Sequence, residues 1–248
     1  MMKEFTCMRG GLRIYGRTYV PDTGLKNYPT VIMCHGFNGS CMGNVKYAEQ
    51  LVPKGFACVM FDFCGGSLRC RSGGDMREMT VSSEIDDLKT VTGCVKEMEF
   101  ADTERLILMG KSQGGFVSAL AAADMKDDIS ALVLLYPAFT IPLMAKRTER
   151  EMKVIPEEYE ILGGVVGRPY LYDALSLDTD KCFAYGGDVL ILHGDRDDIV
   201  PLSSSKRAEK LYRSAELHII EGAGHGFRNG EVKRACELMS VFLKNSAE

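Results

Sequence analysis

Six short runs of almost wholly apolar residues recur along this 248-residue chain, and they constrain its fold more than any other feature of the sequence. A run that is apolar throughout, instead of alternating with polar residues, is typical of a strand covered on both faces, as in a parallel sheet. The runs lie at 30–34, 56–61, 106–109, 131–135, 189–192 and 217–220. They predict six strands of a mostly parallel sheet.

The segments between these runs have the periodicity of helices. The clearest one repeats apolar residues every three or four positions, which places them on one helical face. These residues are Val81, Ile85, Leu88, Val91, Val95 and Met98. Shorter helices are expected at 45–52, 116–123, 204–212 and 231–243.

Two β-rich runs at 4–9 and 12–20 flank Gly10-Gly11 at the start of the chain and predict an antiparallel hairpin. Together with the six apolar runs they give an eight-stranded, mostly parallel sheet. Strands that alternate with helices indicate an α/β fold with helices on both faces. We therefore expect a single domain over residues 1–248.

One stretch interrupts this alternation. About fifty residues separate the strand that ends at Leu135 from the one that begins at Val189, far more than an ordinary crossover needs. We interpret residues 140–187 as an inserted cap or lid over the edge of the sheet. The glycines at 163, 164 and 167 indicate a small hairpin within it.

Composition excludes several classes of function. The net charge of −4, without a basic stripe, makes nucleic acid an unexpected partner. No apolar run approaches the ~20 residues that span a bilayer, and the first residues do not resemble a signal peptide. The nine cysteines form no C-x-x-C pair, so we expect reduced thiols, a cytoplasmic location, and neither metal nor cofactor.

The sequence Gly110-Lys111-Ser112-Gln113-Gly114 matches the pattern G-x-S-x-G. It directly follows a predicted strand and precedes a predicted helix, which is the setting of a nucleophile elbow. Glycines allow the sharp turn that exposes the serine hydroxyl, and the helix N-terminus favours developing negative charge. The alternative is a serine in a structural glycine turn. We predict that Ser112 is a nucleophile.

A neutral serine needs a base to activate it. His225 lies in a glycine-rich turn after the last strand, from which a loop can reach the elbow. The acid should come from the turn after the preceding strand, where Asp195, Asp197 and Asp198 are all candidates and spacing does not choose among them. The N–H groups of Gln113 and Phe37 are the expected oxyanion donors, because one follows the nucleophile and the other lies in the loop after the first parallel strand.

These motifs, taken in order, resemble the α/β-hydrolase superfamily over nearly the whole chain. They are His35-Gly36-Phe37, Gly110-x-Ser112-x-Gly114, His193-Gly194-x-x-Asp197-x-x-Val200-Pro201 and Gly224-His225. The resemblance implies the α/β-hydrolase fold and places the acid on Asp197. Within the superfamily the chain is most similar to the small bacterial cinnamoyl and feruloyl esterases, which share its length, its H-G-F loop, a Tyr136-Pro137-Ala138-like segment and an inserted cap of this size.

The resemblance implies a serine carboxylic-ester hydrolase that acts through an acyl-enzyme on a hydroxycinnamoyl or similar small acyl ester. Phe37, Tyr170, Tyr172 and Phe227 are the expected substrate-binding residues, although packing of the cap onto the body explains such side chains equally well. A serine peptidase or amidase on the same fold is an alternative. A ligand-binding pseudo-hydrolase is another, against which the complete triad argues. The expected partner is a small-molecule ester, without nucleic acid or membrane, and a homodimer stays open.

Overall fold

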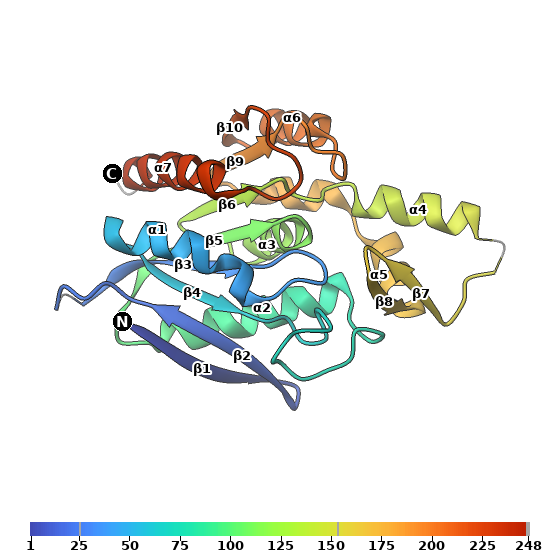
Figure 1. Cartoon of the computed structure of the whole chain (residues 1–248), viewed down its shortest axis with the longest axis horizontal. Helices are drawn as coiled ribbons and strands as arrows, with labels where there is room; N and C mark the ends of the chain where they lie inside the picture. Colours follow the sequence, from blue (N-terminus) through green and yellow to red (C-terminus); the bar gives the residue numbers. More distant parts are fainter. Residues whose placement is uncertain (25, 153, 247–248) are drawn as a thin grey trace.

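A computed structural model describes residues 1–24, 26–152 and 154–246 of the chain. Eight strands form one sheet in the order β1-β2-β4-β3-β5-β6-β9-β10 (Figure 1). Every neighbouring pair from β4 to β10 is parallel, whereas β2 is antiparallel to both β1 and β4. The strands are β1 (Met2–Arg9), β2 (Leu12–Tyr19), β3 (Tyr28–Cys34), β4 (Ala57–Phe61), β5 (Ala101–Lys111), β6 (Ala131–Leu135), β9 (Asp188–Gly194) and β10 (Ser214–Ile220). The predicted eight-stranded, mostly parallel sheet is confirmed.

Helices cover both faces of the sheet, which explains why its central strands are apolar throughout. Val31 and Met33 of β3 pack in one core cluster with residues of two helices, α1 (Val45–Leu51) and α7 (Asn229–Asn245). Ile32 and Cys34 pack in the other cluster with residues of α2 (Val81–Lys96) and α3 (Gln113–Asp124). All four of these β3 side chains are completely buried, which explains why they are apolar on both faces of the strand.

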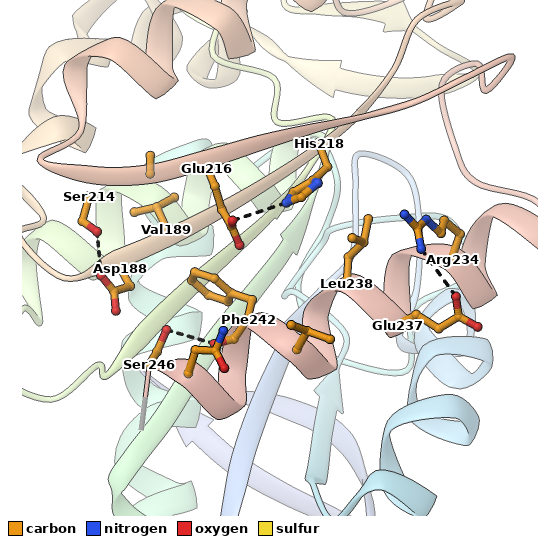
Figure 2. Close-up of a pocket in the computed structure, with 13 residues that line it drawn as sticks. Asp188, Val189, Ser214, Glu216, His218, Arg234, Glu237, Leu238, Phe242 and Ser246 are labelled. Atoms are coloured by element: carbon orange, nitrogen blue, oxygen red, sulfur yellow. Dashed lines mark hydrogen bonds and ion pairs between the residues drawn. The ribbon is translucent and has the colours of Figure 1, made fainter. Parts of the chain in front are cut away.

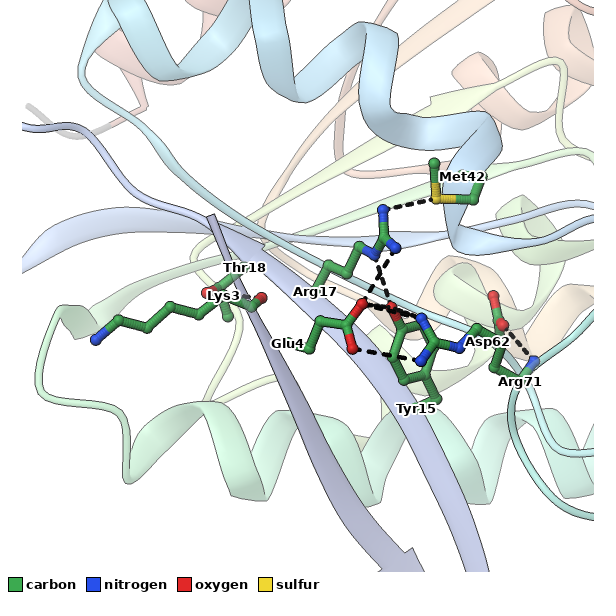
Figure 3. A network of polar contacts seen from close by, with 8 residues as sticks. All are labelled: Lys3, Glu4, Tyr15, Arg17, Thr18, Met42, Asp62 and Arg71. Carbon is green, nitrogen blue, oxygen red and sulfur yellow. Dashed lines mark hydrogen bonds and ion pairs between the residues drawn. The ribbon is translucent and has the colours of Figure 1, made fainter. Parts of the chain in front are cut away.

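A polar network ties the N-terminal hairpin to the loops that follow β3 and β4 (Figure 3). Asp62, directly after β4, accepts hydrogen bonds from the backbone N–H groups of Cys41 and Arg71, each at 2.7 Å. The Arg71 guanidinium stacks on the Tyr15 ring at 3.7 Å and pairs with Glu4 at 2.9 Å. Its hydrogen bond lowers the pKa of Glu4 to about 2. The network fixes the segment between β3 and α1, which contributes to the site described below.

The segment 140–187 contains two helices, a separate hairpin and one 3-10 helix. These are α4 (Ile141–Glu151), β7 (Glu158–Ile161), β8 (Gly164–Gly167), α5 (Arg168–Ser176) and η3 (Thr179–Ala184). Strands β7 and β8 pair antiparallel through a two-residue turn in which Leu162 and Gly163 have φ of 45° and 74°, as such a turn requires. In Figure 1 the hairpin and α5 lie together at one end of the molecule.

Several element boundaries differ from the sequence expectation. Strand β5 begins at Ala101, because the polar residues 102–105 hide its first half from an apolar pattern. Helix α3 begins at Gln113, so Gly114 already belongs to its first turn, whereas Gly110 lies in β5. Helix α6 (Leu202–Leu211) lies where the sequence predicted one, at 204–212. Residue 153 of the expected insertion and residues 247–248 lie outside the described residues.

No helix within the described part of the chain is both long enough and apolar enough to cross a membrane.

Candidate active site

The turn between β5 and α3 presents Ser112 in a strained conformation. Its φ is 53° and its ψ is −120°, which few residues other than glycine adopt. A Cβ on Gly110 would lie 2.1 Å from the Gly114 carbonyl oxygen, and one on Gly114 would lie 2.2 Å from the His35 carbonyl oxygen. The glycines of the motif are therefore required by close backbone contacts that hold the elbow against the end of β3.

His225, in the loop after β10, lies between Ser112 and Asp197. Its Nε2 is 2.9 Å from Ser112 Oγ, and its Nδ1 is 2.8 Å from Asp197 Oδ2. Because a carboxylate oxygen accepts hydrogen bonds, Nδ1 carries the proton and Nε2 is free to accept the one on the serine hydroxyl. This is the tautomer that a general base for Ser112 needs.

The Asp197 side chain is completely buried, and both of its oxygens are hydrogen-bonded. Oδ1 accepts from the backbone N–H groups of Ile199 at 2.9 Å and Val200 at 2.8 Å. Asp195 instead accepts from the Gly222 N–H at 2.6 Å, and Asp198 is exposed. Of the three candidate carboxylates, only Asp197 therefore meets His225.

A second buried histidine orients this acid. His193 Nε2 lies 3.0 Å from the Val200 carbonyl oxygen and 3.2 Å from Asp197 Oδ2, and both of these atoms only accept. Nε2 therefore carries the proton, and Nδ1 accepts from the Ser205 hydroxyl at 2.7 Å. Burial lowers the pKa of His193, which favours this neutral form. His193 thus holds the loop after β9 in place through Val200, Ser205 and Asp197.

The loop after β3 lies directly against the nucleophile. A Cβ on Gly36 would be 3.1 Å from Ser112 Cβ, so the following Phe37 N–H is close to the elbow. The buried His35 fixes this loop, since its Nδ1 donates to the Gly36 carbonyl at 2.8 Å and its Nε2 accepts from the Phe63 N–H at 3.1 Å. Burial lowers the pKa of His35 to about 4 and keeps it neutral. The other expected donor, the Gln113 N–H, belongs to the first residue of α3, where helical N–H groups have no intrahelical partner.

A cavity of about 130 Å³ opens beside Ser112. Apolar side chains from the loop after β3, from α4, from the hairpin and from α5 form most of its wall. The lining residues are Phe37, Ser112, Gln113, Ala138, Ile141, Met144, Ala145, Thr148, Tyr159, Ile161, Leu162, Tyr170, Leu171, Ala174, Ile199 and Val200. Elements of the 140–187 segment thus supply most of the wall.

Two tyrosines in this wall differ in how their hydroxyl groups are satisfied. The Tyr170 hydroxyl donates to Gln113 Oε1 at 2.7 Å. The Tyr159 hydroxyl is buried and has no hydrogen-bond partner among the described residues, and the residue as a whole is 9% exposed. A buried hydroxyl without a partner is costly, so a ligand that supplies one would bind favourably.

Two of the expected substrate-binding residues are placed elsewhere. Tyr172 is 52% exposed and lies outside the cavity wall, because it occupies the solvent face of α5. Phe227 is 2% exposed and packs on the Tyr136 ring at 5.0 Å, which in turn packs on His225 at 4.8 Å. Phe227 therefore packs behind Tyr136, which contacts His225, and it does not line the cavity. The expectation that Tyr172 and Phe227 bind the substrate is corrected by these positions.

Glu84, which was not predicted from the sequence as a site residue, is 1% exposed and accepts a hydrogen bond from Gln113 Nε2 at 2.9 Å. Its position was visible in the sequence, since it lies three residues after Val81 and four before Leu88 and so shares their apolar face. A carboxylate on the buried face of a helix is unusual and is typical of a functional or positioning role.

A wider groove of about 450 Å³ lies between β10 and α7, away from this site (Figure 2). His218 and Glu216 pair there at 3.4 Å, and Arg234 and Glu237 approach to 3.8 Å. No residue of the Ser112–His225–Asp197 chain lines it, so the groove has no part in the chemistry of the elbow.

The arrangement around Ser112 can perform acyl transfer. The hydroxyl can pass its proton to His225 as it attacks a carbonyl carbon, and Asp197 stabilises the imidazolium that forms. The N–H groups of Phe37 and Gln113 are the expected donors to the developing oxyanion. Within residues 1–24, 26–152 and 154–246, no group of three or more His, Cys, Asp or Glu side chains is arranged to hold a metal ion.

The model of the prolyl oligopeptidase family matches residues 44–247. The chain belongs to the prolyl oligopeptidase family. Among solved structures, this family member is similar to Est1E from Butyrivibrio proteoclasticus with ferulic acid bound, with a TM-score of 0.88 and 26% identity over 98% of this chain and 99% of that chain. The resemblance to α/β-hydrolases inferred from the motifs is confirmed, and so is the class of the protein as a hydrolase.

Two curated relatives of this prolyl oligopeptidase family member are also similar. The quorum-quenching protein AidA of Acinetobacter baumannii is 28% identical over 51% of this chain and 45% of that protein. The monoacylglycerol lipase of Mycolicibacterium smegmatis is 22% identical over 85% of this chain and 84% of that protein. The match spans less than half the length of AidA, so the activity of the whole AidA protein is not transferred to this chain.

Proposed function

We propose that this protein is a serine carboxylic-ester hydrolase that acts through an acyl-enzyme on Ser112, with a hydroxycinnamoyl (feruloyl-type) or similar small acyl group. The observation that carries the proposal is the small apolar cavity beside Ser112. Its wall includes Tyr159, whose buried hydroxyl has no hydrogen-bond partner among the described residues. The serine accepts the acyl group, and the cavity selects it.

The size and lining of the cavity favour a small acyl group with a polar substituent. Its volume of about 130 Å³ is well below the ~300–1,000 Å³ of sites for drug-sized ligands. Aromatic and aliphatic side chains suit a planar ring, and the Tyr159 hydroxyl suits a hydroxyl or methoxy group on it. The similarity to Est1E, which binds ferulic acid, supports the same acyl class.

A serine peptidase or amidase is the second candidate, because the chain belongs to the prolyl oligopeptidase family. Peptidases that select a free N-terminal amine need a counter-charge close to the nucleophile. The cavity wall, as far as the described residues define it, contains no acidic or basic side chain. The electrostatics of the cavity therefore favour an uncharged acyl group over a free N-terminal amine.

A panel of substrates separates these proposals. Purified protein and its Ser112→Ala variant would be assayed on p-nitrophenyl acetate, methyl acetate, methyl ferulate and aminoacyl amides. We expect kcat/KM for methyl ferulate to exceed that for every amide, and all activity to be lost in the variant. A higher kcat/KM on the amides would refute the ester assignment. A kcat/KM for methyl ferulate no greater than that for methyl acetate, which has the same leaving group, would refute the acyl group.

The remaining expectations stand as proposals of the same kind. We infer a small-molecule ester as the partner, without nucleic acid or membrane, and a cytoplasmic location. A pseudo-hydrolase is disfavoured by the Ser112–His225–Asp197 contacts, because a protein that only binds a ligand does not need a base in the tautomer found here.

A further inference from the structure

A buried polar chain connects the residue after the nucleophile with the inserted segment. The Tyr170 hydroxyl on α5 donates to Gln113 Oε1 at 2.7 Å, and Gln113 Nε2 donates to Glu84 Oε2 at 2.9 Å. Glu84 is 1% exposed and Gln113 is 2% exposed, so water does not replace either bond. One side chain thus joins α2, α3 and α5.

The backbone of the same residue supplies an expected oxyanion donor. Gln113 is the first residue of α3, and its N–H has no partner within the helix that would set its direction. The preceding Ser112 has a φ of 53° and a ψ of −120°, a conformation that persists only when its surroundings hold it. The Gln113 side chain is hydrogen-bonded at both its amide oxygen and its amide nitrogen. These bonds restrain the Cα of Gln113 and therefore the backbone N–H of the same residue.

Glu84 is suited to be the final acceptor in this series of side-chain hydrogen bonds. Burial raises its pKa to about 8, with smaller contributions from the carboxylates of Asp87 on α2 and Asp173 on α5. It is therefore mostly neutral at pH 7 and adds little negative charge near a site that must stabilise an oxyanion. Glu84 thus gives the Gln113 side chain a fixed acceptor without placing a full negative charge near the developing oxyanion.

We propose that the Gln113 side chain, held between Glu84 and Tyr170, is a positioning device that aims the Gln113 N–H at the oxyanion once α5 is seated on the body. The inference rests on the proposed serine-hydrolase function. It gives the inserted segment a second role, because seating of α5 contributes to the rate on every substrate as well as to the shape of the acyl cavity.

The chain offers a matched control for this idea. Asp173, also on α5, accepts from the Ser82 N–H at 3.0 Å and from the Ser82 hydroxyl. This second link docks the same helix on α2 without touching Gln113. Ser82→Ala removes one hydrogen bond between the segment and the body, whereas Tyr170→Phe removes one that also reaches Gln113 and keeps its ring beside Phe37.

The experiment measures kcat and KM on p-nitrophenyl acetate, together with the Tm, for wild type, Tyr170→Phe, Ser82→Ala, Gln113→Met and the double variant Tyr170→Phe/Gln113→Met. Loss of an oxyanion donor costs about 10²–10³ in kcat, and a donor that is misaimed but retained should cost about 10-fold. We expect this loss in Tyr170→Phe with KM unchanged within about twofold. Ser82→Ala should keep its kcat even where its Tm falls.

The double variant tests whether the three residues act as a unit. If they do, it is no slower than Gln113→Met alone, because the first substitution has already broken the chain. Wild-type kcat in Tyr170→Phe, an equal loss in Ser82→Ala, or losses that multiply in the double variant would each overturn the inference and leave the proposed function intact. A wild-type protein that hydrolyses neither esters nor amides would overturn both. If Gln113→Met does not fold, the two single hydroxyl deletions still decide.

Discussion

Replacing Glu84 by Gln should change how the stability of the protein depends on pH. The pKa of Glu84 rises from its ordinary value of 4.5 to about 8 in the folded chain, mainly because burial disfavours the charged carboxylate. Between these two values the folded state binds a proton that the unfolded state has released. The contribution of Glu84 to the free energy of unfolding therefore falls as pH rises through this window and is constant on either side of it.

The size of the effect follows from the shift. Each pH unit within the window costs about 1.4 kcal/mol, so the full shift from 4.5 to about 8 corresponds to about 5 kcal/mol. This is a large fraction of the ~5–15 kcal/mol that stabilises a typical protein. Gln keeps an acceptor for Gln113 Nε2 but does not titrate, so the Glu84→Gln variant lacks this slope.

Urea unfolding at pH 5, 6, 7 and 8 measures the difference in unfolding free energy between variant and wild type. We expect Glu84→Gln to gain about 4 kcal/mol relative to wild type between pH 5 and pH 8. Asp86→Asn, which removes an exposed carboxylate from the same helix, is the control and should show no such gain. A difference between Glu84→Gln and wild type that does not vary with pH would refute the claim that Glu84 is buried as a neutral acid.

Two further substitutions test the site. Asp197→Asn should lower kcat on p-nitrophenyl acetate by about 10⁴, because His225 would then adopt the wrong tautomer. Asp198→Asn, at an exposed residue, should stay near the wild-type kcat. The reverse order would show that the acid is misassigned. Tyr159→Phe should raise KM for methyl ferulate by about 10-fold and leave KM for p-nitrophenyl acetate unchanged. Tyr172→Phe should alter neither KM. A parallel loss of activity on both esters would mean that Tyr159 supports the fold and does not bind the acyl group.

The sheet could be predicted from the sequence because burial on both faces leaves a strong local signal. Strands such as β3 and β6 are buried along almost their whole length, so their residues are apolar almost without interruption. The first half of β5 carried no such signal, since the polar residues at 102–105 are partly exposed there. Where a strand leaves the core, its sequence no longer distinguishes it from a loop.

The residues around the nucleophile were predictable for a different reason. The turn at Ser112 leaves no room for a Cβ at positions 110 and 114, so the glycine spacing itself records the geometry. The acid was not fixed by spacing, because Asp195, Asp197 and Asp198 differ only in which partners they meet across the fold. A contact between distant segments, such as that of Asp197 with His225, is not encoded in any local pattern.

The lining of the cavity was the least predictable part. Tyr170 and Tyr172 are two positions apart on α5, and which of them faces the body depends on how the inserted segment packs. The structure turns Tyr170 inward, where its hydroxyl is already bound to Gln113, and leaves Tyr172 in solvent. Tyr159 lies on β7, and its hydroxyl has no partner among the described residues. The periodicity of the sequence does not reveal that this strand lies close to Ser112.

The central claim is that Ser112 is the nucleophile, and covalent labelling tests it most directly. The protein would be treated with a fluorophosphonate and the modified peptide identified by mass spectrometry, with kcat of Ser112→Ala measured in parallel on p-nitrophenyl acetate. We expect a single adduct on Ser112 and a loss of about 10⁴–10⁶ in kcat in a variant that still folds. An adduct on another residue, or a variant that keeps a tenth of the wild-type rate, would contradict the account.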